Sequence, residues 1–297
     1  MKKARSRDGT EIAFDRLGEG PSVILIGGAF SYRAFPKMVL LADLLAPGFS
    51  VINYDRRGRG DSGDTRAYAV EREIEDLESL IAAAGGSASL WGWSSGAVLA
   101  LRAAAAGLRV DRLALYEPPF LVDDSRPPPP ADFSERLDAM LVAERRSAAV
   151  KHYMTKAMGV PRPIVALMRV APFWRNLKAV AHTLPYDWAV MGDTLGGRPL
   201  SVDEWGAVTQ PTLAISGEKS PTQLRNAARA IADVLPEGRH RELKGQSHNP
   251  SMKALAPVLQ EFFADAGPPQ EARSGGSGTA RSRPDRADPL TSRSNSP

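Results

Sequence analysis

A serine framed by two glycines is the first candidate for chemistry in this chain. Residues 90–98 read LWGWSSGAV, in which Gly92 and Gly96 lie two positions before and two positions after Ser94. A strand that turns sharply into a helix needs small residues at such positions, and the turn pushes the serine Oγ out at the carboxyl edge of a sheet. The pattern alone fits either a nucleophile or a small residue in a Gly/Ser-rich loop, so the surrounding elements must decide.

The residues that could take a proton from this serine are few. The chain has no cysteine, which excludes disulfides and thiolate metal sites, and no metal is implied. A serine nucleophile is activated by an adjacent general base, and an imidazole is a common one. The candidate imidazole bases are His152, His182, His240 and His248.

Short apolar runs alternate with helical patterns along most of the chain. The segments KKARSR and EIAFDRL, joined by the turn signal Asp8-Gly9, predict an antiparallel hairpin. Further strands are predicted at residues 22–28, 49–55, 88–93, 112–117, 212–217 and 239–245. Helices are predicted at Val70–Ala84, Ser95–Ala106, Pro221–Leu235 and Met252–Phe263. This alternation predicts an α/β fold with a mainly parallel sheet flanked by helices.

These elements place Ser94 between the end of a central strand and the start of an alanine-rich helix. That is the strand–turn–helix context which a nucleophilic serine of this type requires. The N-terminus of the helix points backbone amides and a positive dipole toward the site. We therefore predict that Ser94 is the nucleophile and that the amide of Ser95 donates to an oxyanion.

The stretch between residues 118 and 208 carries no clear strand pattern. It begins with proline-rich sequence, continues through helical patterns rich in methionine and aromatic residues, and ends near the capping-box spelling Ser201-Val202-Asp203-Glu204. Such a stretch is too long for an ordinary connection between strands. The prediction is a helical cap at 118–208, inserted into a core made of residues 1–117 and 209–266.

Composition is that of an ordinary globular protein. The chain has 297 residues, of which 43% are apolar and 24% charged. The first ten residues, MKKARSRDGT, lack the apolar stretch of a secretory signal, and no window reaches the length of a membrane span. The expectation is a cytoplasmic protein without a membrane partner.

The formal net charge of +4 raises the question of a nucleic-acid partner. The arginines are scattered, and several of them lie in the last thirty-one residues, so no nucleic-acid partner is expected. Residues 267–297 are rich in Gly, Pro, Ser and Arg and contain almost no apolar residues. Such a segment cannot bury enough surface to offset the entropy of ordering, so it is predicted to be disordered.

Residues 1 to about 265 resemble the α/β-hydrolase superfamily. NYDRRGRGDSG at 53–63 matches the Y-D-x-R-G-x-G-x-S loop that follows the fourth strand in many capped members. IGGAF at 26–30 lies where the superfamily has its oxyanion loop, usually H-G-x, with Gly27 replacing the histidine. The resemblance implies that the Ala29 amide is the second oxyanion donor.

The same resemblance implies which histidine is the base. GQSHNPS at 245–251 lies after the last strand and before the final helix, where the superfamily carries its catalytic histidine. His248 is therefore expected to be the base. His152 and His182 fall in the predicted cap and His240 falls in a strand, where surface or structural roles are expected.

In the superfamily an acidic residue orients the catalytic histidine and completes a triad with the serine. The position of this acid is where the present sequence departs from the superfamily. Relatives usually place it as G-x-x-D after the strand TLAISG, but GEKS puts Ser220 there, and a serine cannot stabilise an imidazolium. Some members take the acid from the end of the preceding sheet strand, where Glu117 stands, and this is the assignment we favour. Glu218 and a site without a working acid remain alternatives, with Asp203 and Asp193 behind them.

These residues predict a serine hydrolase that works through an acyl-enzyme and needs no cofactor. A carboxylic ester with small to medium hydrophobic groups is the expected substrate, and the partner is that small molecule. The alternatives are a C–C bond hydrolase or lyase on the same framework and a non-catalytic ligand-binding homologue. The sequence leaves the oligomeric state open.

Overall fold

The computed structural model describes residues 1–65 and 67–265, so the predicted disordered tail at 267–297 lies outside the described residues. The strands are β1 (Lys2–Arg5), β2 (Glu11–Leu17), β3 (Ser22–Ile26), β4 (Ser50–Tyr54), β5 (Ala88–Trp93), β6 (Val110–Tyr116), β7 (Thr212–Gly217) and β8 (Gly238–Leu243). They form one sheet in the order β1-β2-β4-β3-β5-β6-β7-β8.

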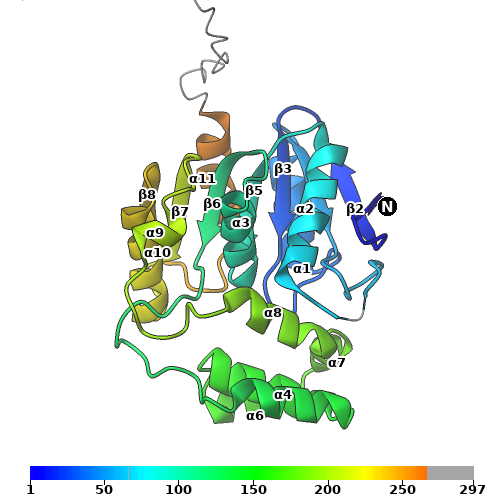
Figure 1. Cartoon of the computed structure of the whole chain (residues 1–297), viewed down its shortest axis with the longest axis vertical. Helices are drawn as coiled ribbons and strands as arrows, with labels where there is room; N and C mark the ends of the chain where they lie inside the picture. Colours follow the sequence, from blue (N-terminus) through cyan, green and yellow to red (C-terminus); the bar gives the residue numbers. More distant parts are fainter. Residues whose placement is uncertain (66, 266–297) are drawn as a thin grey trace, which may run out of the picture. The chain divides into compact units, whose positions relative to one another are not determined.

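The pairing is antiparallel at one edge and parallel elsewhere. β1 pairs with β2 and β2 pairs with β4 in antiparallel fashion, whereas all pairs from β4 to β8 are parallel. The predicted hairpin is thus present, and Gly9 adopts a φ of 87° in its turn. The predicted fold class, a mainly parallel sheet flanked by helices, is confirmed (Figure 1).

Helices cover both faces of the sheet. They are α1 (Pro36–Leu45), α2 (Val70–Ala84), α3 (Ser95–Ala105), α10 (Thr222–Val234) and α11 (Met252–Ala264). In β3, Ile24 and Ile26 face the cluster that contains α2, α3 and α10, while Val23 and Leu25 face the cluster that contains α1 and α11. Because successive side chains of a strand point to opposite faces, an unbroken apolar run is what a strand covered on both sides requires.

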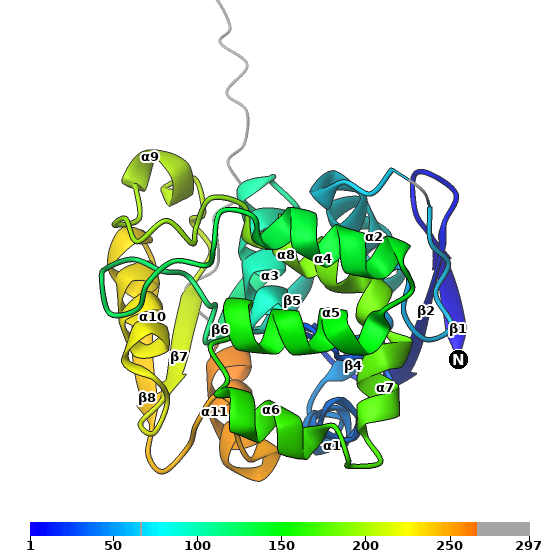
Figure 2. The same cartoon turned by 90° about the horizontal axis from the view of Figure 1, so that it is seen from below.

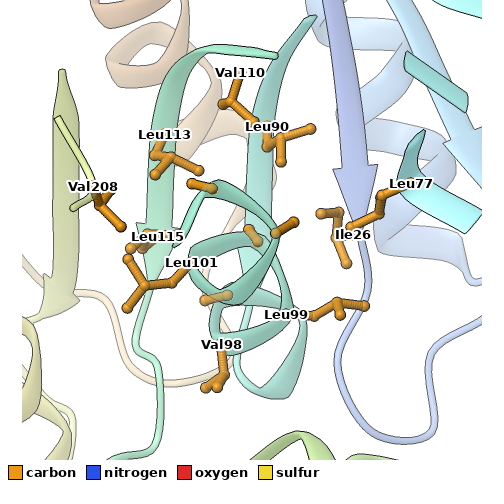
Figure 3. Packing of buried hydrophobic residues seen from close by; sticks show 14 of the residues in the cluster. Ile26, Leu77, Leu90, Val98, Leu99, Leu101, Val110, Leu113, Leu115 and Val208 are labelled. Atoms are coloured by element: carbon orange, nitrogen blue, oxygen red, sulfur yellow. The ribbon is translucent and has the colours of Figure 1, made fainter. Parts of the chain in front are cut away.

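Helix α3 holds the turn before it in place by burying almost its whole surface. Figure 3 shows Val98, Leu99 and Leu101 of this helix packed among side chains of the sheet, with Leu90 of β5 and Leu115 of β6 nearby. All of these side chains are buried. The start of α3, and with it the end of β5, is therefore set by the central core of the protein.

The predicted helices agree with the observed ones to within one residue at each end, but α1 was missed. Its sequence, PKMVLLADLL, is apolar with little helical periodicity, and Phe35 in the N-cap position offers no capping side chain. The one available start signal was Pro36, because proline is favoured in the first turn of a helix.

Further helices lie between β6 and β7. They are α4 (Phe133–Val142), α5 (Arg146–His152), the π-helical turn η1 (Tyr153–Ala157), α6 (Arg162–Met168), α7 (Trp174–Ala179), the 3₁₀ turn η2 (Ala181–Thr183), α8 (Leu184–Met191) and α9 (Val202–Trp205). Ser201 is the N-cap residue of α9, as the sequence predicts, because its hydroxyl accepts a hydrogen bond from the amide of Asp203.

Apart from α9, which lies beside α10, these inserted helices lie at the carboxyl ends of the parallel strands (Figures 1 and 2). A cluster of buried apolar side chains, which includes Phe133, Tyr153 and Leu184, joins them to one another. Other residues of the insertion, such as Met191 and Trp205, belong to the core on the α3 face of the sheet. The domain boundaries at 117–118 and 208–209 stay a prediction. Among the described residues, no helix is long and apolar enough to cross a membrane.

Candidate active site

Ser94 occupies a strained turn between β5 and α3. Its φ of 57° and ψ of −126° lie in a region that non-glycine residues rarely adopt. The Ser94 amide donates to the Tyr116 carbonyl at 2.9 Å, and the Ser94 carbonyl accepts from the Ala97 amide at 2.9 Å. Backbone strain of this kind persists only where the surrounding structure holds it. The turn therefore displays the serine side chain in a fixed place at the carboxyl end of β5.

The two glycines around Ser94 are needed because backbone passes close to them. A Cβ atom on Gly92 would lie 2.4 Å from Cα of Ala97, and one on Gly96 would lie 2.3 Å from the Ile26 carbonyl oxygen. Both distances are far shorter than a van der Waals contact. The G-x-S-x-G spacing thus lets β3, β5 and α3 approach one another at the turn.

Glu117 and His248 form a hydrogen-bonded pair. The Nδ1 of His248 donates to Oε2 of Glu117 at 2.7 Å. The other carboxylate oxygen of Glu117 accepts from the amide of Gly217 at 2.6 Å. Glu117 is 0% exposed, whereas the side chain of His248 is 28% exposed. A carboxylate on Nδ1 sets the histidine tautomer and leaves Nε2 as an acceptor.

The backbones of this pair are also held. Glu117 follows β6 directly and has a φ of 47°, so the carboxylate leaves the strand end at a strained residue. His248 lies on the loop between β8 and α11, and its carbonyl accepts from Nε1 of Trp93 at 3.0 Å. Trp93 precedes Ser94 in the chain, so the loop of the histidine is tied to the turn of the serine.

The alternative acids do not contact His248. Glu218 is exposed and accepts from the amide of Gly245 at 2.7 Å. Asp203 and Asp193 are exposed as well. Ser220, at the position where relatives carry the acid, is buried with a hydroxyl that finds no hydrogen-bond partner in the described part of the chain.

The other three histidines bond elsewhere. Nε2 of His152 lies 3.2 Å from the Phe133 carbonyl, and Nε2 of His182 lies 2.8 Å from the Gly58 carbonyl. His240, in β8, bonds to the Ser216 hydroxyl at 2.9 Å. These contacts are those of structural histidines.

Ala29 and Ser95, whose backbone amides are the expected oxyanion donors, line the same cavity as Ser94. Neither amide donates to an acceptor within residues 1–65 or 67–265. The first N–H groups of a helix have no partner within the helix, and Ser95 begins α3. Two free N–H groups beside a serine can donate hydrogen bonds to a negatively charged oxygen of a bound group, which is the role expected of them.

A cluster of buried ion pairs contacts the two backbone segments that carry these amides. Arg59 donates to the carbonyls of Gly28 and Ser31 at 2.8 and 3.0 Å and to Oδ2 of Asp187 at 2.6 Å. Arg56 donates to Oδ1 of Asp187 at 2.6 Å. The carbonyls belong to the loop that carries Ala29, so the arginines fix its backbone.

The same aspartate contacts the serine turn. The Ser95 hydroxyl donates to Oδ1 of Asp187 at 2.7 Å, and Asp187 belongs to α8 of the insertion. Burial by itself raises the pKa of Asp187, but the Arg59 and Arg56 guanidinium groups outweigh it and hold the pKa below its ordinary value. Glu73 supplies a second carboxylate for Arg56 and accepts two hydrogen bonds of 2.6 Å from it.

The loop motif has its own arginine at Arg57, so the sequence singled out neither Arg56 nor Arg59, and it gave no role to Asp187. A usable signal was present, because Asp187 is the one charged residue of α8, LPYDWAVM. A carboxylate inside an apolar helix is expected to meet a buried cation. Which cation it meets cannot be read from the local sequence.

One cavity of about 650 Å³ is lined by Ser94, His248, Ala29 and Ser95. Most of its wall is apolar, with aromatic, methionine and leucine side chains contributed by the sheet core and by the insertion. They include Phe35, Trp93, Met158, Met168, Phe173, Leu177 and Trp188. Within the described residues, no cluster of three or more His, Asp or Glu side chains is arranged to hold a metal ion.

Comparisons with known proteins agree with the fold. A family model described as the alpha/beta hydrolase family matches residues 23–261. An alpha/beta hydrolase from Sphaerobacter thermophilus is 53% identical over 88% of this chain and 100% of its own chain, with a TM-score of 0.83. No curated protein matches the chain.

More distant solved structures share the fold. An esterase from Exiguobacterium antarcticum is 19% identical, with a TM-score of 0.64 over 89% of this chain and 97% of its own. A meta-cleavage product hydrolase from Pseudomonas fluorescens is 17% identical, with a TM-score of 0.62 over 90% of this chain and 98% of its own.

Proposed function

The chain belongs to the alpha/beta hydrolase family, and we propose that it is a serine hydrolase that cleaves carboxylic esters through an acyl-enzyme. The observation that carries this proposal is the Glu117–His248 hydrogen bond at the wall of the cavity that Ser94 also lines. Nucleophile, base and acid are then Ser94, His248 and Glu117.

In the first half of the proposed reaction, Ser94 Oγ attacks the ester carbonyl carbon and its proton passes to Nε2 of His248. The carbonyl oxygen becomes an oxyanion, which accepts hydrogen bonds from the amides of Ala29 and Ser95. When the tetrahedral species collapses, the bond to the alcohol breaks and His248 returns the proton to the leaving oxygen. Glu117 stabilises the imidazolium while it carries that proton.

In the second half, water attacks the acyl-enzyme, and His248 accepts its proton. The oxyanion forms again at the same two amides, and collapse releases the carboxylic acid as the proton returns to Ser94 Oγ. The apolar cavity wall supports substrates with small to medium hydrophobic groups, because such groups gain free energy when they leave water.

The test of this proposal is labelling by a fluorophosphonate probe, followed by a panel of neutral 4-nitrophenyl esters of increasing acyl length. We expect the wild-type protein to be labelled and to hydrolyse the esters, and Ser94→Ala to lose both properties while it keeps the thermal unfolding midpoint. Removing the nucleophile of such a triad costs several orders of magnitude in rate. Undiminished turnover by purified Ser94→Ala would place the nucleophile elsewhere, and absence of labelling and turnover in the wild type would favour a ligand-binding role.

A further inference from the structure

Arg126 lines the same cavity as Ser94 and His248. It lies on the link between β6 and α4, which Figure 1 shows running from the lower end of β6 toward the inserted helices. The residue is partly buried. A cation has thus been placed in a wall that is otherwise mainly apolar.

The charge of Arg126 has no counterion among the residues that the structure describes. Among residues 1–65 and 67–265, no carboxylate lies within ion-pair distance of its guanidinium, and no aspartate or glutamate lines the cavity. No other arginine and no lysine lines it. Buried or partly buried arginines are ordinarily paired, as Arg56 and Arg59 are in this protein.

The guanidinium is nevertheless held in place. Its Nη2 donates to the carbonyls of Lys156 and Ala157 at 2.9 and 2.7 Å, at the end of the π-helical turn. Gly159 lies beside the group, since a Cβ atom there would be in ordinary van der Waals contact with Nη1, at 3.5 Å. Nε and Nη1 donate to no acceptor within the described ranges. The bonds of Nη2 thus orient the side chain, while Nε and Nη1 can donate to a bound molecule.

The environment of Arg126 disfavours its charge unless an anion is present. Burial lowers the pKa of Arg126, yet an arginine stays protonated in proteins. A carboxylate matches the planar, forked donors of a guanidinium and can accept two parallel hydrogen bonds from it. A bound carboxylate would supply the counterion that the described part of the chain does not provide.

We propose that Arg126 binds a carboxylate group carried by the substrate, which makes the enzyme selective for amphiphilic esters with one negative charge. This inference rests on the proposed ester hydrolysis and adds its substrate class: an ester with an apolar body and a second, ionised carboxyl group. Arg126 is a substrate-binding residue and takes no part in the bond-breaking steps.

The test compares esters that differ in charge on either side of the scissile bond. On the acyl side, the mono-4-nitrophenyl esters of succinic, glutaric and adipic acid are compared with the 4-nitrophenyl esters of butanoic, pentanoic and hexanoic acid. On the alcohol side, 4-acetoxybenzoate is compared with 4-acetoxybenzamide. We expect kcat/KM to be about 10- to 100-fold higher for the charged ester in at least one series, as expected for a charge-assisted hydrogen bond.

Arg126→Met should remove that preference, mainly by raising KM for the charged ester, and should leave the neutral esters within about threefold of wild type. Arg126→Lys should keep part of the preference, because it retains the charge but loses the forked geometry. Arg169→Met is the matched control, since Arg169 is an exposed cation of the same insertion that does not line this cavity. It should keep the full preference.

Labelling by the fluorophosphonate probe separates this inference from the function on which it rests. A labelled wild-type enzyme with equal kcat/KM for charged and neutral esters in both series would overturn the role of Arg126 and leave the serine hydrolase intact. An equal loss in Arg126→Met and Arg169→Met would assign any preference to general electrostatic attraction and would also overturn it. A wild-type protein that is neither labelled nor active would overturn the proposed function and, with it, this inference.

Discussion

Glu117 and Asp187 are both fully buried carboxylates near the serine turn, but they meet different partners. Glu117 accepts from a histidine that is partly exposed to the cavity and from one backbone amide. Asp187 accepts from two buried arginines and a serine hydroxyl. One partner is an imidazole, a group that can accept and release a proton during a reaction, whereas the arginines stay charged.

This difference separates two uses of a buried charge. A carboxylate on a histidine can stabilise a proton that arrives and leaves during a reaction. A carboxylate between arginines holds a fixed charge balance, and here it ties α8 of the insertion to the turn of Ser94 and to the loop of Ala29. We therefore expect changes at Glu117 to alter rate and changes at Asp187 to alter stability.

Glu117→Gln should have the largest effect. The neutral amide cannot stabilise the imidazolium, so kcat should fall about 10³- to 10⁴-fold while substrate binding is largely kept. Steady-state kinetics with the best 4-nitrophenyl ester measures this, and thermal unfolding checks that the variant folds. A kcat within tenfold of wild type in a folded variant would refute the assignment of the acid.

Asp187→Asn should instead destabilise the protein by about 3–5 kcal/mol, because it removes one partner from a buried cluster and leaves arginine charge uncompensated. Urea unfolding followed by tryptophan fluorescence measures the change. If Asp187→Asn has the same free energy of unfolding as wild type but has lost activity, the expected contrast between Asp187 and Glu117 is wrong.

The low pKa of Asp187 predicts that its contribution to stability depends on acidity. Its pKa in the folded protein lies below the ordinary value of an aspartate, so the stabilisation is fully present above about pH 4 and is lost as the pH falls through the folded-state pKa. Unfolding free energies between pH 2 and 6 should show a weaker acid dependence in Asp187→Asn than in wild type. Parallel curves for the two proteins would contradict this.

Ser95→Ala tests the link between the two regions, because it removes the hydroxyl that contacts Asp187 and keeps the proposed amide donor. We expect a loss of about 1 kcal/mol in stability and a decrease of a few fold in kcat. A loss as large as that of Glu117→Gln would mean that the hydroxyl acts on the substrate directly.

Glu218→Gln should have the smallest effect and serves as the control for Glu117→Gln. Glu218 is exposed and bonds the Gly245 amide, so its variant should hydrolyse esters within about twofold of wild type. Equal kinetic losses in the two glutamine variants would transfer the acid role away from Glu117.

Much of the fold follows from local patterns. Alternating apolar strands and amphipathic helices predicted the elements that flank the sheet, apart from α1, whose apolar sequence has too little periodicity to mark it. Strand boundaries shifted by up to two residues, as at β6, where Val110 begins the strand and Glu117 lies just beyond its end. Glu117 thereby gains the strained backbone that directs its side chain, which no strand pattern foretells.

The sequence by itself determined which residues were available for chemistry: one serine between two glycines, four histidines and a motif with three arginines. It determined the turn at Ser94 as well, because glycine spacing and the change from strand to helix are local properties. The family resemblance pointed to Glu117 as the partner of His248, which no local pattern does, and the partners of Asp187 were decided by tertiary structure alone. Glu117 lies 131 residues from His248, and Arg56 lies 131 residues from Asp187. Only the parallel sheet, which brings the carboxyl ends of its strands to one edge, and the insertion that lies across that edge bring these charges together.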